Sequence, residues 1–301
     1  MLRLREDGWA GKQRLLRLLA NLEAEEWCRQ TIYLNPISAV PARSLLSSGT
    51  RESLLEEIRR KVGEPETGLV LFVGEQQATA IVPPVPLVED ALFEGTETAP
   101  LTKLVETNLL IGVVLLRLGR YAVGVLRGDE LVASKTGSRY VKNRHKAGGT
   151  SQHRFARSRE RLVRELFDKA CEVARNVFSP YQKGMSHVFL GGEQHTLRAF
   201  VQRCSHLQTL ENKTLKRRLQ VDRPGQVALE KIAFEVWKSR VLTFDLGGES
   251  PLNLPPRGGE AKSLPLAGEG SDGGSTIVSQ PRRATQPTAP CSRRRRPGES
   301  Q

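Results

Sequence analysis

Residues 109–135 read LLIGVVLLRLGRYAVGVLRGDELVASK, and this stretch contains the clearest fold signal in the chain. It divides into three runs, Leu109–Leu118, Tyr121–Arg127 and Glu130–Lys135, which are separated by Gly119-Arg120 and Gly128-Asp129. Runs rich in valine and leucine that are joined by two residues including glycine are typical of β-hairpins. The stretch therefore predicts an antiparallel meander of three strands over residues 108–136.

The chain before this meander alternates between helical and strand patterns. Leucines at helical spacing predict an amphipathic helix over residues 12–27, and residues 31–34 read as a short strand. A second helical pattern covers residues 51–62. Residues 68–73 and 78–82 are apolar runs on either side of a glycine-containing turn, so we expect them to pair as neighbouring strands.

After the meander the pattern becomes mainly helical. Residues 152–178 predict a long amphipathic helix, with apolar side chains on one face and arginines on the other. Further elements follow in the order strand, helix, strand, helix, at residues 186–190, 193–202, 215–221 and 225–240. This order of elements predicts an α/β fold in which a mixed β-sheet is flanked by helices.

Composition divides the chain into three parts. Residues 247–301 contain nine glycines and eight prolines, few large apolar side chains and a closing run of arginines. Such a composition cannot bury a hydrophobic core, so we expect a disordered basic tail. We expect residues 28–246 to form one folded domain, preceded by a helical extension over residues 1–27.

The four cysteines and the hydropathy pattern suggest where the protein works. Cys28, Cys171, Cys204 and Cys291 lie far apart and have no histidine at metal-ligand spacing. We therefore expect neither a zinc site nor a disulfide framework, which suits a reducing compartment. The most apolar run is too short to cross a bilayer, and the N-terminus resembles no export signal. These features predict a cytoplasmic protein that does not bind membranes.

The excess positive charge is concentrated in one segment. The chain has 46 lysines and arginines against 33 acids, a net charge of +13, which suggests a polyanionic partner such as nucleic acid. Residues 135–164 contain ten lysines and arginines and one acid, Glu160, a net charge of +9. A charged helix alone is usually a solvated surface, but here the preceding loop is basic too. We therefore interpret seven residues as RNA-binding candidates: Lys142, Arg144, Lys146, Arg154, Arg157, Arg161 and Arg164.

The loop contains a short motif that could take part in catalysis, Gly148-Gly149-Thr150-Ser151-Gln152. Two glycines permit backbone geometries that other residues avoid and allow another backbone to approach closely. Gln152 offers a neutral amide near the start of a helix, where free N–H groups favour negative charge. Such a group could orient a water molecule and stabilise an oxyanion during ester hydrolysis. By itself, so short a motif more commonly marks a flexible turn.

The longer stretch Lys146–Phe178 resembles the catalytic middle domain of eukaryotic and archaeal class-one release factors. It has the two glycines, a glutamine close behind them, the sequence Arg154-Phe155-Ala156-Arg157 and a long amphipathic helix. The similarity covers about residues 28–245 and points in particular to the Vms-like release factors (the VLRF family) of actinobacteria and chloroflexi. The resemblance implies a ribonuclease-H-like fold for the catalytic domain, no metal or organic cofactor, and a catalytic role for Gly148–Gln152.

The motif departs from that of class-one release factors, which have Gly-Gly-Gln. When the sequences are aligned on Arg154-Phe155, Thr150 stands at the position of that glutamine, and Gln152 follows two residues later. Either Gln152 or Thr150 could therefore be the working residue. About thirty residues precede the similarity, so we expect no stop-codon-reading domain and an activity that does not depend on a codon.

The resemblance implies a function in ribosome rescue. It predicts a monomeric peptidyl-tRNA hydrolase that acts on stalled large ribosomal subunits, with ribosomal RNA and peptidyl-tRNA as its partners. Two alternatives remain open. The loop could direct an endonuclease that clips the acceptor end of the tRNA, or it could be a docking finger of a non-catalytic factor that binds ribosomal RNA.

Overall fold

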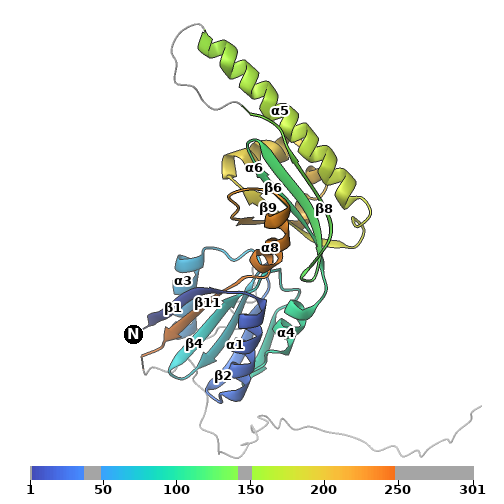
Figure 1. Cartoon of the computed structure of the whole chain (residues 1–301). Helices are drawn as coiled ribbons and strands as arrows, with labels where there is room; N and C mark the ends of the chain where they lie inside the picture. Colours follow the sequence, from blue (N-terminus) through green and yellow to red (C-terminus); the bar gives the residue numbers. More distant parts are fainter. Residues whose placement is uncertain (1, 37–48, 142–150, 248–301) are drawn as a thin grey trace, which may run out of the picture. The chain divides into compact units, whose positions relative to one another are not determined.

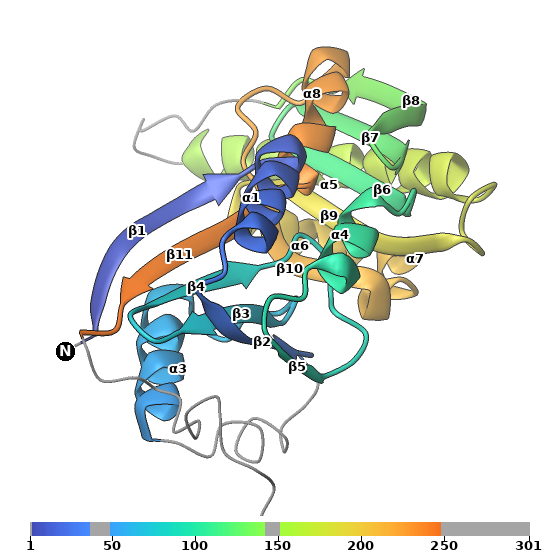
Figure 2. The same ribbon diagram turned by 90° about the horizontal axis from the view of Figure 1, so that it is seen from below.

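The computed structural model describes residues 2–36, 49–141 and 151–247. Within these ranges the strands form one sheet of six strands and one of five, and helices pack on both faces of each sheet (Figures 1 and 2). The predicted mixed α/β class is confirmed, with the strands divided between two sheets. No helix in the described ranges is long and apolar enough to cross a membrane.

The first sheet is antiparallel throughout. Its strands, in spatial order, are β1 (Arg3–Ala10), β11 (Ser239–Asp245), β4 (Gln77–Val82), β3 (Leu69–Gly74), β2 (Cys28–Leu34) and β5 (Ala91–Glu94). Helix α3 (Gly49–Val62) packs on one face, and α1 (Lys12–Ala24) and α4 (Ala99–Glu106) pack on the other. Along β3, Leu71 lies in the core on the α3 side and Phe72 in the core on the α1 side. Burial on both faces explains why this strand is apolar at every position.

The second sheet is mixed and contains the meander. Its spatial order is β10 (Thr214–Leu219), β9 (Met185–Gly192), β6 (Leu110–Arg117), β7 (Arg120–Arg127) and β8 (Glu130–Ser138). Strands β6, β7 and β8 are antiparallel neighbours as predicted, whereas β9 runs parallel to β6 and to β10. Gly119 and Gly128 occupy the two meander turns with φ of 96° and 58°, a conformation that glycine adopts easily.

Two helical layers cover the second sheet. Helices α5 (Ser151–Phe178), α6 (Gln194–Arg203) and α7 (Ser205–Gln208) share one core with one face, and α8 (Gln226–Val236) packs on the other. A 3₁₀ turn, η1 (Glu211–Lys213), leads from α7 into β10. The long helix predicted over residues 152–178 is confirmed, and so are a strand and a helix immediately after it.

The predicted helix over residues 225–240 was wrong at its end. Helix α8 stops at Val236, and the chain then forms β11. Arg217 on β10 donates hydrogen bonds to the last carbonyls of α8, including one of 3.3 Å to Val236, and to that of Lys238 at 2.7 Å. Burial lowers the pKa of Arg217 to about 10. This guanidinium donates to carbonyls that, in a longer helix, would accept hydrogen bonds from the backbone N–H groups of the next turn.

The sequence predicted no disulfide framework, and the structure contains one disulfide that the sequence analysis did not foresee. Cys171 on α5 is bonded to Cys204, which directly follows α6, although 33 positions separate them in the sequence. Packing of α5 against α6 brings the two cysteines together, and sequence spacing does not reveal such packing. Cys28 is a free, buried thiol whose pKa is raised by burial.

Candidate functional site

Helix α5 has two halves with different surroundings. From Leu166 onward it contributes buried side chains to the core, among them Ala170, Ala174 and Phe178. From Arg154 to Glu165 no side chain is buried. At 28 residues the helix is about 42 Å long, and Figure 1 shows its N-terminal end projecting past the helices and strands beside it. The first half of α5 is therefore a solvent-facing arm that the second half anchors.

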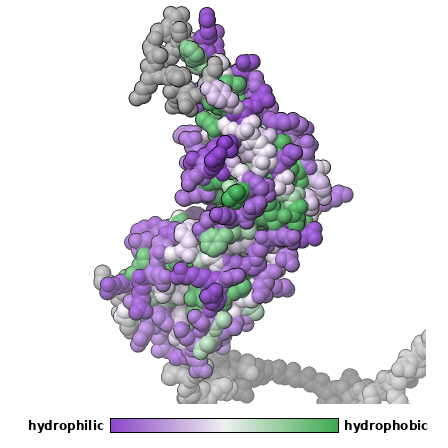
Figure 3. All heavy atoms as spheres, viewed as in Figure 1, coloured by the Kyte–Doolittle hydropathy of each residue, from purple (hydrophilic) through white to green (hydrophobic). Residues whose placement is uncertain are grey.

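The exposed arm is basic. Arg154, Arg157, Arg161 and Arg164 are all exposed, and their spacing of three and four residues places them along one side of the helix. Figure 3 shows mainly hydrophilic residues at this end of α5, with isolated hydrophobic ones among them. These four arginines were predicted from the sequence to share a face, and they are free of the core as that prediction requires.

A carboxylate at the root of the arm connects α5 to the meander. Arg139, just beyond β8, donates a hydrogen bond of 2.8 Å to Glu165, and Arg161 lies 3.7 Å from the other oxygen of the same carboxylate. The hydrogen bond from Arg139 holds the pKa of Glu165 below its ordinary value, and the charge of Arg161 adds to this. The backbone N–H of Arg139 also donates to the carbonyl of Gly119, at 2.9 Å. The strand that leads into residues 142–150 is thus tied to the helix that follows them.

A second set of contacts fixes the anchored half. Arg203 on α6 donates two hydrogen bonds, of 2.6 and 2.8 Å, to the carboxylate of Asp168. These bonds lower the pKa of Asp168, since they stabilise its ionised form. The rings of Phe167, which precedes Asp168, and Phe200, one turn before Arg203, lie 5.7 Å apart between centroids. The ion pair and the contact between the two rings hold α5 against α6 and so set the direction in which the arm extends.

The predicted catalytic motif falls mostly outside the described residues. This holds for Gly148, Gly149 and Thr150, and the RNA-binding candidates Lys142, Arg144 and Lys146 also lie outside the described residues. Ser151 and Gln152 are the first two residues of α5, so their backbone is helical. The prediction that Gln152 stands at a helix start is consistent with this. The roles assigned to these residues stay predictions.

Sequence reasoning missed the contacts that position the arm. Glu165 and Asp168 look like ordinary solvated acids of an amphipathic helix, and their arginine partners are 26 and 35 residues away along the chain. It also missed a groove between α6 and β10, because its lining residues come from segments with no motif. Within the described residues, no cluster of three or more histidine, cysteine or acidic side chains could hold a metal ion.

Residues 110–242 match the family model described as the Actinobacteria/chloroflexi VLRF1 release factor. The matched segment begins at β6 and ends within β11, and it includes the whole second sheet with α5. The resemblance to this family that the sequence suggested is thereby confirmed.

Curated relatives are archaeal proteins named peptide chain release factor subunit 1. The protein from Aeropyrum pernix is 32% identical over 142 residues, which cover 44% of this chain and 38% of the relative. That from Methanopyrus kandleri is 27% identical over 220 residues, covering 63% of this chain and 53% of the relative. The chain thus spans only about half the length of such relatives, or less. Among solved structures, the archaeal translation termination factor aRF1 is similar at 21% identity and a TM-score of 0.33, over 76% of this chain and 73% of that one.

Proposed function

We propose, from the match of residues 110–242 to the VLRF1 release factors, that this chain is a codon-independent peptidyl-tRNA hydrolase of the large ribosomal subunit. In this proposal it frees nascent chains from stalled subunits in the cytoplasm, as a monomer and without a metal or organic cofactor. Its relatives named as release factors support a role in ending translation. The substrate, the subunit and the rescue context go beyond what those names say.

The observation that carries the proposal is the basic arm next to the glycine motif. The arginines of α5 are exposed and stand apart from the core, as phosphate-binding groups must. The motif Gly148-Gly149 precedes this arm directly in the sequence. A basic helix preceded by a glycine motif suits a narrow cleft of RNA, where the helix binds phosphates and the motif reaches the reacting bond. Such a cleft surrounds the acceptor end of a tRNA in the large subunit.

The chemistry assigned to the motif is hydrolysis of the ester between peptide and tRNA. A water molecule attacks the ester carbonyl, negative charge develops on the carbonyl oxygen, and the ribose hydroxyl leaves with a proton. The amide of Gln152 cannot take up a proton near neutral pH, so its role is to orient the water and donate a hydrogen bond. Gly148 and Gly149 let the backbone come close to the substrate, and Ser151 and Thr150 complete the contact surface.

Analysis of the tRNA product tests the reaction type. Purified large subunits carrying peptidyl-tRNA, with no messenger RNA present, are incubated with the protein, and peptide and tRNA are analysed separately. Hydrolysis yields free peptide and full-length tRNA. A tRNA shortened at its 3′ end would instead identify an endonuclease. Binding without either product would identify a docking factor, and the hydrolase proposal would be wrong.

Paired substitutions test which residue of the motif works. Gln152→Ala is expected to leave subunit binding almost intact and to slow cleavage about 10²-fold or more, as loss of one oxyanion-type donor does. Thr150→Ala is the matched control, because the other alignment makes Thr150 the working residue. If Thr150→Ala abolishes cleavage while Gln152→Ala cleaves normally, the assignment of Gln152 is wrong. If neither change slows cleavage, the motif has no catalytic role.

A further inference from the structure

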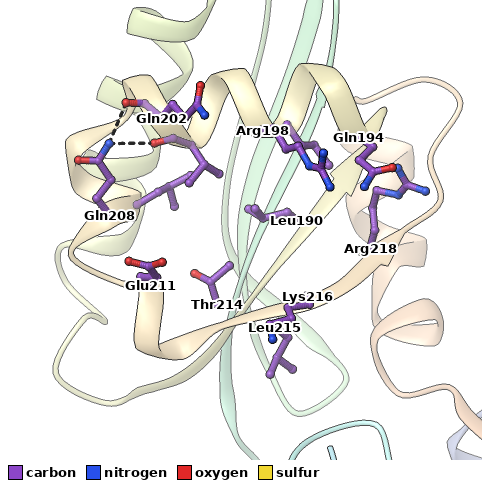
Figure 4. A pocket seen from close by; sticks show the side chains of 13 residues that line it. Leu190, Gln194, Arg198, Gln202, Gln208, Glu211, Thr214, Leu215, Lys216 and Arg218 are labelled. Atoms are coloured by element: carbon purple, nitrogen blue, oxygen red, sulfur yellow. Dashed lines mark hydrogen bonds between the residues drawn. The ribbon is translucent and has the colours of Figure 1, made fainter. Parts of the chain in front are cut away.

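The α5 side of the second sheet is only partly covered by helices. Helix α5 packs on β7 and β8, and α6 packs on β6 and β9. The fifth strand, β10, lies at the edge of the sheet beside α6 and α7 without a helix of its own on this side. A groove of about 690 Å³ runs between these helices and β10 (Figure 4). A volume of this size accommodates several side chains of a bound molecule.

The groove has an aliphatic floor and a basic rim. Its floor is formed by four apolar side chains, Leu190, Leu197, Val201 and Leu207, whereas the side chain of Leu215 lies in the core on the α8 side of the sheet. Arg198, Lys216 and Arg218 lie at its margin and are exposed, and Glu211 is the one acid among the residues that line it. None of these three cations forms an ion pair with a carboxylate of the described chain, whereas many other surface arginines here do. In Figure 4, Arg198 and Arg218 approach the same end of the groove from α6 and from β10.

Features of the groove disfavour two kinds of occupant. An RNA base in a sequence-tolerant site commonly stacks on an aromatic ring, but the floor is built from branched aliphatic side chains and no ring lines the groove. A partner strand cannot simply extend the sheet, because Glu66 already accepts hydrogen bonds from the backbone N–H groups of Lys216 and Arg217, at 2.6 to 3.0 Å. The pairing of β10 is also irregular between Thr214 and Arg218.

We infer that this groove binds a short segment of a partner protein in which acidic side chains alternate with leucine-sized apolar ones. The apolar side chains fill the aliphatic floor, and the carboxylates pair with Arg198, Lys216 and Arg218. Charge complementarity identifies the partner, since three unpaired cations outnumber the single acid, Glu211, among the lining residues. Strands β10 and β8 are opposite edges of the sheet, so this surface is separate from the basic arm that follows β8. A partner bound here leaves the arm accessible.

Selection from a displayed library of random short peptides tests the inference with the full chain. Peptides rich in both acidic and leucine-sized residues are expected to be enriched on the wild-type protein. Their affinity is expected to fall at least about tenfold with Arg198→Glu/Arg218→Glu, and also with Val201→Glu in the floor. Arg14→Glu/Arg17→Glu on α1 makes the same change of charge elsewhere and is expected to have little effect. Equal loss with the α1 variant would mean general attraction to a basic protein and would overturn the inference.

Further variants and a second probe make the result decisive. Melting temperatures establish that each variant is folded; if the glutamate pair is not, Arg198→Gln/Arg218→Gln replaces it. Arg198→Lys/Arg218→Lys keeps the charges and is expected to retain most of the affinity. Failure to enrich any groove-dependent peptide, or enrichment of peptides without acids, refutes the proposed partner. Binding of a labelled single-stranded RNA is measured with the same variants. If the loss of Arg198 and Arg218 weakens RNA binding but not peptide binding, the groove is a nucleic-acid surface and the inference is wrong.

Discussion

His206 on α7 is a buried histidine in contact with the anchored half of α5. Its ring centroid lies 6.2 Å from that of Phe178, and its Nε2 has no hydrogen-bond partner within the described residues. Burial, and next the positive charge of Arg175, lower its pKa below the ordinary value of 6.5. The folded protein therefore binds this proton at lower pH than the unfolded chain does. Stability should decrease as pH falls below the ordinary value and should level off below the folded pKa.

Replacement of this histidine gives the first prediction. His206→Phe is expected to reduce the loss of melting temperature between about pH 7 and pH 5, because the group that takes up a proton on unfolding is gone. His195→Gln, at an exposed position of α6, is the control and should keep the wild-type dependence. Some dependence will remain in either variant, since burial also lowers the pKa of His187. A His206→Phe protein with an unchanged pH profile contradicts the assignment.

Among the individual residues of the candidate site, helical periodicity made one group predictable from the sequence. The face shared by Arg154, Arg157, Arg161 and Arg164 follows from their spacing alone. The partners of Glu165 and Asp168 could not be foreseen, because each pairing depends on how β8 or α6 packs beside α5. Which of Gln152 and Thr150 is the working residue stays a prediction, because neither periodicity nor composition distinguishes the two alignments.

The arm of α5 is the element on which binding is expected to depend. Arg157→Ala/Arg161→Ala should weaken binding to the large subunit and lower the slope of log affinity against log salt by about two, one unit for each lost phosphate contact. Thermal stability should hardly change, because Arg157 is exposed and the pair of Arg161 with Glu165 is solvent-accessible. Arg14→Ala/Arg17→Ala removes the same charge from α1 and should leave the slope nearly as it was. A large fall in melting temperature with an unchanged slope would show a structural role for these arginines.

The disulfide between α5 and the residue after α6 is expected to stabilise the packing of these two helices. It closes a loop of 33 residues, which should stabilise the oxidised fold by about 3 to 4 kcal/mol relative to the reduced one. A reductant is therefore expected to lower the melting temperature of the wild-type protein and to have no such effect on Cys204→Ala. Alkylation of denatured, unreduced protein followed by mass spectrometry checks the pairing. Modification of both Cys171 and Cys204 under those conditions would show that the bond does not form.

Elements built from local contacts were predictable, whereas those that depend on distant ones were not. The meander and α5 were foreseen because apolar periodicity and two glycine turns define them within 70 residues. Strand β1 is largely polar, and its partner β11 lies more than 220 positions later, so no local pattern indicated it. The predicted helix over residues 225–240 ran into the first two residues of β11 because no glycine or proline separates α8 from this strand, and the rest of β11 was not predicted. Arg217 forms hydrogen bonds with carbonyls at the helix end and with that of Lys238, just before β11.

In the whole molecule, the last strand of the described residues belongs to the same sheet as the first one. Strand β11 lies between β1 and β4 and pairs with both along its length. Leu242, Phe244 and Leu246 are buried in the first sheet's core, and the backbone N–H of Leu246 donates to the carbonyl of Gln76, at 2.8 Å. Residues 239–247 therefore complete the first sheet, although the sequence places them after the segment that forms the second one.

Two truncations test where the folded domain ends. Removal of residues 248–301 is expected to leave melting temperature and single-turnover cleavage unchanged, because that segment is rich in glycine and proline and its arginine run adds only nonspecific attraction to RNA. Removal of residues 239–301 should unfold the protein. It deletes a strand that is paired on both sides, and the burial of Leu242 and Phe244 alone is worth about 2 to 3 kcal/mol each. Circular dichroism and thermal melting of both products decide the matter. Unfolding of the shorter deletion would place the domain boundary beyond Gly247, and a stable fold without β11 would mean that the second sheet and its helices suffice alone.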